Sequence, residues 1–227
     1  MIFNSAAPLS LPPRRRASGD SGGRIAPFRR EMYRLLLEGV RVRAWDRVLA
    51  VESGDGWAAE EAWRRLTRGY VCGLSSSPRK AELASRLRGV EGHLEFKVWN
   101  RKKFEFPDCS FDCVLSSFAM DRFSEPVATL REVRRVLRPG GDVYILEPDR
   151  KSFYGLYLLW DYYLRLADRL HRRYYSTAEL LQLLVEAGFA GSHQLMCYEK
   201  LLTGGKVLAT ATVVHARRSP WDEAAST

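Results

Sequence analysis

Short apolar segments alternate with amphipathic helical segments along most of the chain, and this alternation limits the folds that the chain can adopt. Runs rich in aliphatic and aromatic residues predict seven strands, at residues 47–51, 70–74, 94–99, 111–118, 142–148, 192–200 and 206–218. Helical patterns lie between or beside them, at residues 56–68, 77–87, 125–141 and 176–189. Strands and helices in this alternation favour parallel βαβ units. We therefore expect an α/β fold, a doubly wound and mostly parallel sheet with helices on both faces.

The end of the chain departs from the parallel pattern. The last two predicted strands are joined by the segment LLTGG, residues 201–205, which contains two consecutive glycines. A short glycine-rich connection between two strands is typical of a hairpin. The last strand is accordingly expected to run antiparallel to its neighbours.

The segments outside this pattern suggest the domain boundaries. Residues 1–26 are rich in Pro, Gly, Ser and Arg and predict a flexible leader without the features of a secretory signal. Residues 27–218 form one expected domain, which begins with a helix at residues 27–40, and residues 219–227 form a flexible tail. Because no apolar run approaches the roughly 20 residues of a membrane-spanning helix, we expect a cytoplasmic protein.

The composition leaves the partners open. The net charge is +9 and the arginines are scattered, with a tight run only at Arg14–Arg16. Solvated surface charge explains this pattern best, while peripheral contact with a membrane or RNA stays open; no nucleic-acid module is recognisable. The four cysteines show no metal-binding spacing, so we expect free thiols and no metal site. Nothing in the sequence indicates an oligomeric state.

Two long motifs carry a resemblance to a known family. FPDCSFDCVLSSF at residues 106–118 is followed by EPVATLREVRRVLRPGGDVYILEP at residues 125–148. In this order and spacing they resemble the small-molecule "type 11" branch of the class I S-adenosylmethionine-dependent methyltransferases, over roughly residues 46–190. The resemblance implies a Rossmann-like fold, S-adenosylmethionine as cofactor, and direct methyl transfer to an acceptor.

The first loop matches the family's glycine motif only in part. In VLAVESGDG, residues 48–56, Gly54 and Gly56 match the second and third glycines, which let the backbone approach the cofactor. Ala50 stands where the family has an acid, and Glu52 where it has the first glycine. The resemblance makes the whole turn a candidate cofactor loop, with Glu52, Ser53, Gly54, Asp55 and Gly56 as its members. Glu52 either lies near the cofactor's ammonium or sulfonium group, or marks a site that has drifted.

Three further strand ends supply the remaining cofactor candidates. Ser75 stands where the family has an acid that binds the ribose hydroxyls, and a hydroxyl lacks the bidentate geometry of a carboxylate. Asn100 stands at the position that reaches the adenine amino group, and its amide oxygen can still accept that bond. Arg101 follows it, and Ser117 lies at the end of the fourth strand.

The catalytic residues are less clearly indicated. Methyl transfer needs mainly alignment, and a general base helps only when the acceptor loses a proton. Asp121, His171 and Tyr174 are the candidates near the expected mouth of the site. Two of them also have a structural explanation: Asp121 can pair with Arg122 or cap the next turn, and His171 can be a solvated helix end. The acid Glu147 is more simply a structural residue of the turn that follows the fifth strand.

Residues 151–176 are unusually rich in tyrosine and leucine and predict an insert or lid. Such a segment can wall a lipophilic or aromatic acceptor, or it can be a helix packed on the core. The leading hypothesis is therefore an S-adenosylmethionine-dependent methyltransferase that acts on a small, lipophilic or aromatic acceptor. The alternatives are a non-catalytic methyltransferase-like protein that binds a partner, and a repurposed enzyme that does not methylate.

Overall fold

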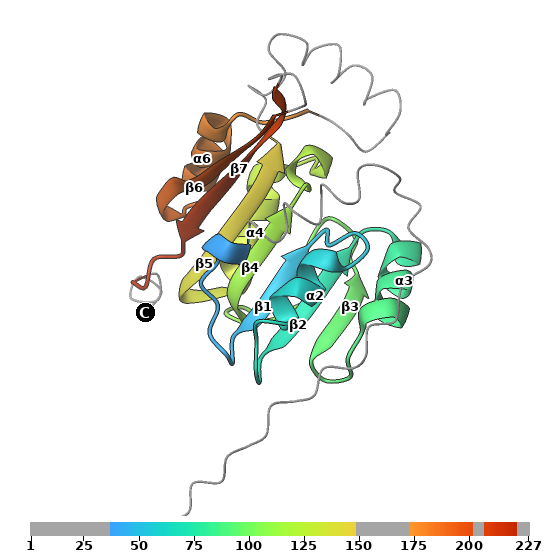
Figure 1. Cartoon of the computed structure of the whole chain (residues 1–227). Helices are drawn as coiled ribbons and strands as arrows, with labels where there is room; N and C mark the ends of the chain where they lie inside the picture. Colours follow the sequence, from blue (N-terminus) through green and yellow to red (C-terminus); the bar gives the residue numbers. More distant parts are fainter. Residues whose placement is uncertain (1–36, 149–172, 202–206, 222–227) are drawn as a thin grey trace, which may run out of the picture.

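The computed structural model describes residues 37–148, 173–201 and 207–221. Its centre is a seven-stranded sheet with the order β3-β2-β1-β4-β5-β7-β6 (Figure 1). The strands are β1 (Arg47–Val51), β2 (Tyr70–Ser75), β3 (Leu94–Val98), β4 (Phe111–Ser117), β5 (Leu137–Pro148), β6 (Ala190–Leu201) and β7 (Val207–Arg217). The helical elements are α2 (Trp57–Trp63), α3 (Pro78–Arg88), η1 (Met120–Arg122), α4 (Pro126–Val136) and α6 (Thr177–Glu186).

The strand directions confirm the expected doubly wound sheet. The pairs β1–β2, β2–β3, β1–β4 and β4–β5 are parallel. Strand β7 is antiparallel to both β5 and β6, as the Gly-Gly connection predicts. The chain leaves β1 toward β2 and β3 and then returns to place β4 on the other side of β1. In such sheets, ligands bind beyond the carboxyl ends of the strands at this reversal.

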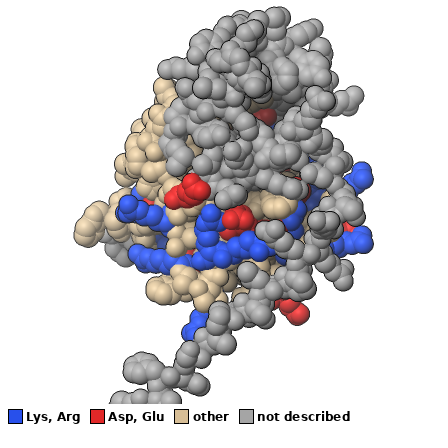
Figure 2. All heavy atoms as spheres, in the orientation of Figure 1, with Lys and Arg blue, Asp and Glu red and all other residues tan. Residues whose placement is uncertain are grey.

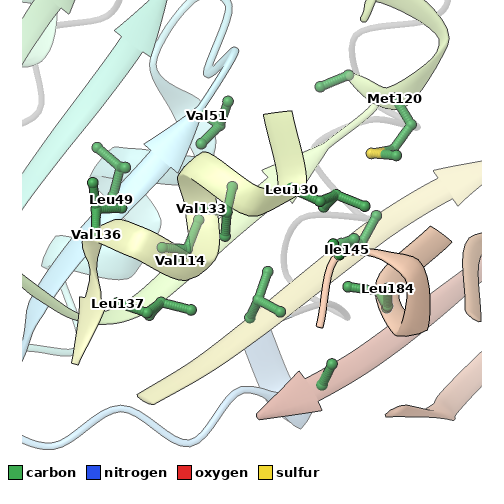
Figure 3. Packing of buried hydrophobic residues seen from close by; sticks show 14 of the residues in the cluster. Leu49, Val51, Val114, Met120, Leu130, Val133, Val136, Leu137, Ile145 and Leu184 are labelled. Atoms are coloured by element: carbon green, nitrogen blue, oxygen red, sulfur yellow. The ribbon is translucent and has the colours of Figure 1, made fainter. Parts of the chain in front are cut away.

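Apolar side chains on both faces of the sheet hold the layers together. On one face, α4 and α6 contribute Leu130, Val133 and Leu184, which pack against strand residues such as Val114 and Ile145 (Figure 3). On the other face, the cluster consists of small α2 residues, the segment before β1, and the opposite sides of the strands: Ala58, Ala59, Ala62, Leu37, Val40, Val48 and Leu115. Each strand of the sheet centre is thus buried on both sides, as its continuous apolar sequence predicts.

The ends of two helices differ most from the sequence prediction. Helix α2 ends at Trp63 instead of residue 68, because the backbone N–H groups of Thr67 and Arg68 both donate to the carbonyl of Ala44 and turn the chain toward β2. Helix α4 ends at Val136, and the Pro-Gly-Gly segment belongs to β5, since Leu137 already pairs with Phe111 on β4. Long-range pairing overrides helix propensity at both sites.

Arg135, in the family-like motif at residues 125–148, has a clear structural role. Arg135 on α4 donates to the carbonyls of Phe104 and Phe106 and pairs with Asp108 and Glu132, at 2.6 and 2.9 Å. The guanidinium therefore fixes the turn that leads into β4. Burial acts to raise the pKa of Glu132, but the bonds from Arg135 outweigh it and lower that pKa.

The described surface mixes both signs of charge. Lys and Arg side chains form a band across the face seen in Figure 2, with acidic side chains among them. Part of this charge is paired locally, as in the pairs Arg64–Glu60 and Arg65–Glu61 along α2. In the described ranges no helix has the length and apolar character needed to cross a bilayer.

Several expectations fall outside the described ranges. They concern the leader, most of the predicted helix at residues 27–40 (of which residues 37–39 are helical), most of the aromatic insert, and the end of the tail. His171 belongs to this group. Of the cysteines, Cys72, Cys109 and Cys113 are free thiols, and burial raises the pKa of Cys72 to about 11.

Candidate cofactor site

The candidate residues meet along the carboxyl edge of four parallel strands. The loop after β1 lies beside the ends of β2 and β4, and the end of β3 follows next to β2. Among the described residues, four non-glycine residues have positive φ, and three of them lie in these loops: Glu52 at 50°, Arg101 at 62° and Phe118 at 54°. Residues other than glycine rarely adopt this backbone conformation, and those that do are concentrated in functional sites.

The two matched glycines serve different purposes. Gly54 has φ +58°, and a β-carbon built there would meet nothing closer than the Glu52 carbonyl at 4.0 Å. Gly56 has φ +84° and precedes α2, but a β-carbon there would lie 2.7 Å from the Phe96 ring. Gly54 thus leaves open space at the surface of the loop, as a cofactor loop requires, whereas Gly56 is required by packing inside the fold.

The loop is anchored from two sides. The N–H of Ser53 donates to the carbonyl of Leu74 at the end of β2, over 2.8 Å, and its hydroxyl donates to the same carbonyl. Arg88 at the end of α3 donates to the carbonyl of Asp55 at 2.8 Å and pairs with Glu60. Ser53, through its N–H and hydroxyl, and Asp55, through its carbonyl, thus fix the shape of the loop.

The Glu52 side chain points toward the ends of β2 and β3. Its carboxylate is 7% exposed; Oε2 accepts from the N–H of Ser76 at 3.4 Å, and Oε1 lies 3.5 Å from Nε of Arg101. Arg101 also donates to the hydroxyl of Ser76. The ion pair between Glu52 and Arg101, together with the hydrogen bonds of both residues to Ser76, links the loops that follow β1, β2 and β3.

The predicted ribose and adenine residues are engaged within their own turns. The hydroxyl of Ser75 is buried and accepts from the N–H of Ser77 at 3.2 Å, while Ser77 caps α3. The side-chain oxygen of Asn100 accepts from the N–H groups of Lys102 and Lys103, at 2.9 and 3.4 Å. Asn100 is exposed, and its amide nitrogen remains a donor for a ligand.

A hollow of about 380 Å³ lies next to these turns. It is lined by Ser76, Ser77, Trp99, Asn100 and Arg101. The Trp99 ring is buried against Phe104, with ring centroids 5.0 Å apart, and supplies an apolar wall. A hollow that joins hydroxyl, amide and cationic groups to one aromatic wall suits a nucleoside.

Buried polar atoms without a hydrogen-bond partner gather at the same edge. Among the described residues they include Oε1 of Glu52, the hydroxyls of Ser116 and Ser117 at the end of β4, and the indole N–H of Trp99. Such atoms are rare because burial without a partner is costly. Together with the open space at Gly54, these atoms fit a polar ligand that lies across β1, β2 and β4.

A second group of carboxylates lies where β4 and β5 end. Glu147 is 2% exposed, and its Oε1 accepts from the N–H groups of Ala119 and Met120, at 2.7 and 2.9 Å. Burial, followed by the nearby charge of Asp121, raises the pKa of Glu147 to about 8; the two backbone bonds and Arg122 oppose this. Asp121 Oδ1 lies 3.9 Å from Nε of Arg122. The sequence interpretation that Asp121 pairs with Arg122 and that Glu147 supports a turn agrees with these contacts.

Several residues of this edge could not be predicted from the sequence. The roles of Arg88 and Trp99 and the contact of Arg101 with Glu52 depend on which loops become neighbours, and no local pattern signals them. Tyr174 is half-buried just before α6. Ser117, in contrast, was placed correctly at the strand end because the motif fixes the limits of β4.

Comparison with known proteins identifies the domain. The family model described as "Methyltransferase domain" (type 11) matches residues 49–145. The chain is 36% identical over 118 residues to the ubiquinone/menaquinone biosynthesis C-methyltransferase UbiE of Pseudomonas putida, covering 50% of this chain and 46% of that protein. It is 33% identical over 148 residues to the demethylmenaquinone methyltransferase of Thermotoga maritima, covering 64% and 61%. This chain thus spans roughly half the length of the first relative and about three fifths of the second.

The crystal structure of the YcgJ protein from Bacillus subtilis has the same fold, with a TM-score of 0.69 at 18% identity over 83% of this chain and 98% of that one. The cofactor of this family, S-adenosylmethionine, fits the open glycine loop and the unpartnered polar atoms described above. Residues 49–145 therefore match the type 11 branch of the class I S-adenosylmethionine-dependent methyltransferases, and the described sheet has the fold of a solved structure that resembles it.

Proposed function

We propose that this chain transfers the methyl group of S-adenosylmethionine to a small lipophilic acceptor of the quinol type. The observation that carries the proposal is the similarity to two proteins named as quinone-biosynthesis methyltransferases, at 36% and 33% identity. The aromatic composition of residues 151–176 is compatible with an acceptor of this kind.

The bound cofactor supplies an electrophilic methyl group, and the protein has to hold the acceptor in line with it. Gly54 leaves the loop after β1 open for the cofactor, and the hydroxyl of Ser117 is available to it from β4. Asn100 and Arg101 line the hollow on the nucleoside side of the same edge. Glu52 and Ser75 are bonded to two further residues of its lining, Ser76 and Ser77. In this proposal these six candidate residues lie along one extended ligand.

Methylation at a ring carbon also requires loss of a proton, which a positioned base accelerates. Asp121 is the proposed base. It lies in η1 at the end of β4, and its charge faces Glu147, which the raised pKa keeps largely protonated near neutral pH. His171 and Tyr174 remain alternative proton acceptors from the segment that leads to α6.

The test is a methyl-transfer assay with purified protein, S-adenosylmethionine and a short-chain demethylmenaquinol, followed by mass spectrometry. We expect a product heavier by one methylene and a stoichiometric amount of S-adenosylhomocysteine. Asp121→Asn should lower kcat by about 100-fold or more with little change in cofactor affinity, while Glu125→Gln, an exposed change near the start of α4, should not. Cofactor binding without product from any quinol or phenol would instead favour a non-catalytic binding protein.

A further inference from the structure

Glu52 combines an unusual backbone with an unusual side-chain environment. Its φ of 50° is one that glycine adopts freely and a residue with a β-carbon adopts rarely. The adjacent loop residue Gly54 has a similar φ of 58°. A glutamate that keeps such a conformation at a ligand-binding edge points to a function for its side chain.

The carboxylate of Glu52 is buried but incompletely bonded. The side chain is 93% buried, and the one described group that donates a hydrogen bond to it, the N–H of Ser76, does so over a long 3.4 Å. Oε1 faces Arg101 at 3.5 Å and accepts no hydrogen bond from the part of the chain that the structure describes. A buried carboxylate normally accepts several short hydrogen bonds, so Oε1 retains the capacity to accept one more.

The carboxylate of Glu52 lies close to the position at the end of β2 where Rossmann-like sites have an acid and this chain has none. Rossmann-like sites use an acid at the end of β2 to bind the ribose hydroxyls, but here β2 ends in Ser75. The hydroxyl of Ser75 already accepts from Ser77 within its own turn. Glu52 reaches across from β1 and contacts Ser76, the residue directly after that position. The carboxylate absent from β2 is thus supplied by the neighbouring strand.

Arg101 provides the counter-charge beside this buried carboxylate. Its guanidinium lies against Glu52 and also donates to the hydroxyl of Ser76. Arg101 is itself 27% exposed and lines the hollow beside Trp99 and Asn100. The guanidinium therefore both balances the charge of Glu52 and holds its carboxylate beside Ser76, which lines the same hollow.

We propose that Glu52 binds the ribose diol of the cofactor, with Oε1 accepting a hydrogen bond from a ribose hydroxyl and Arg101 acting as the positioning residue. The proposal rests on S-adenosylmethionine as the cofactor of this domain and does not depend on the acceptor. It assigns Glu52 to the ribose, whereas the sequence alone suggested the ammonium or sulfonium group. The opposing explanation is that the Glu52–Arg101 pair closes a site that has lost its ligand.

Calorimetric titration with S-adenosylhomocysteine distinguishes the two explanations. Glu52→Gln keeps the shape but removes the charge, and it should weaken binding by about 10- to 100-fold, the range for a hydrogen bond to a charged group. Glu52→Gly should weaken binding similarly while raising the melting temperature, because glycine relieves the positive φ. Glu61→Gln, on the outer side of α2, serves as the matched control and should change neither affinity nor fold.

Two further measurements identify the group that Glu52 contacts. The wild type should bind 5′-methylthioadenosine at least 10-fold more tightly than its 2′,3′-dideoxy analogue, and Glu52→Gln should abolish most of that difference. The double variant Glu52→Gly/Ser75→Asp returns the acid to β2 and should recover affinity to within a few-fold of the wild type. Recovery would show that one carboxylate can replace the other.

Unchanged or tighter binding by Glu52→Gly would overturn the proposal and support the closed-site explanation. A discrimination between the two nucleosides that persists in Glu52→Gln would also overturn it. If the wild type binds no S-adenosylhomocysteine at millimolar concentration, both this proposal and the proposed function fail. If binding depends on Glu52 but no quinol is methylated, only the proposed acceptor fails.

Discussion

Replacing Glu147 with glutamine tests the electrostatics of the mouth of the site. The amide oxygen of glutamine can still accept from the N–H groups of Ala119 and Met120, which hold the turn after β4. The amide cannot ionise, however, and the charge of Asp121 then acts on a neutral neighbour. The variant thus separates the hydrogen bonds of Glu147 from its proton.

The sign and size of the effect follow from the raised pKa of about 8 against an ordinary value of 4.5. Between these values the folded protein holds a proton on Glu147 that the unfolded chain releases. Stability from this group is therefore fully present below pH 4.5 and is lost as the pH rises through 8. The free energy of unfolding of the wild type should fall by up to about 1.4 kcal/mol per pH unit within this window.

Urea unfolding, followed by far-UV circular dichroism between pH 5 and pH 8, measures this slope. The difference in stability between Glu147→Gln and the wild type should shift in favour of the variant as the pH rises. Glu125→Gln, which changes an exposed carboxyl, should follow the wild type. Parallel curves for the wild type and Glu147→Gln would refute the argument, since they would mean that Glu147 is ionised in the folded protein throughout.

Two predictions concern the scaffold. Arg135→Ala removes bonds to two carbonyls and two carboxylates. It should lower the free energy of unfolding by about 2–3 kcal/mol in the same urea assay. The control Arg131→Ala, at an exposed position of α4, should change that free energy by less than about 0.5 kcal/mol. Gly56→Ala places a methyl group 2.7 Å from Phe96 at φ +84° and should cost about 2–4 kcal/mol; Gly92→Ala, at φ +73° in open space, should cost only about 1 kcal/mol. Equal losses at the two glycines would contradict the role assigned to packing.

The sequence predicted the sheet well because its signals are local and repeated. The strands from β1 to β5 are apolar runs bounded by turns, and the glycines between β6 and β7 imply the reversal that is observed. The helix ends were less predictable. Thr67 and Arg68 extend a helical pattern, yet both bond to Ala44, a residue more than twenty positions earlier. Tertiary contacts decide whether these residues continue the helix or bond to Ala44, and no local sequence pattern shows the outcome.

The candidate site was predictable as a set of positions but not as a set of contacts. The glycine motif and the strand ends located Gly54, Ser75 and Asn100 at one edge of the sheet. The direction of the Glu52 side chain depends on a φ of 50° and on an arginine 49 positions later, and neither can be inferred from the spacing of the motif. The bonds of Glu147 to the turn after β4 depend in the same way on two strands that are adjacent only in the fold.

The departures at Ala50, Glu52 and Ser75 are best understood together. Ala50 is 1% exposed and pairs in register with Gly73 on β2, two residues before Ser75. Acids at all three positions would gather carboxylates at one buried edge, where like charges raise each other's pKa and disfavour ionisation. One carboxylate, held by Arg101, avoids that repulsion. It follows that Ser75→Asp alone, with Glu52 retained, should be less stable than the paired exchange, because only the exchange keeps the number of buried charges at this edge constant.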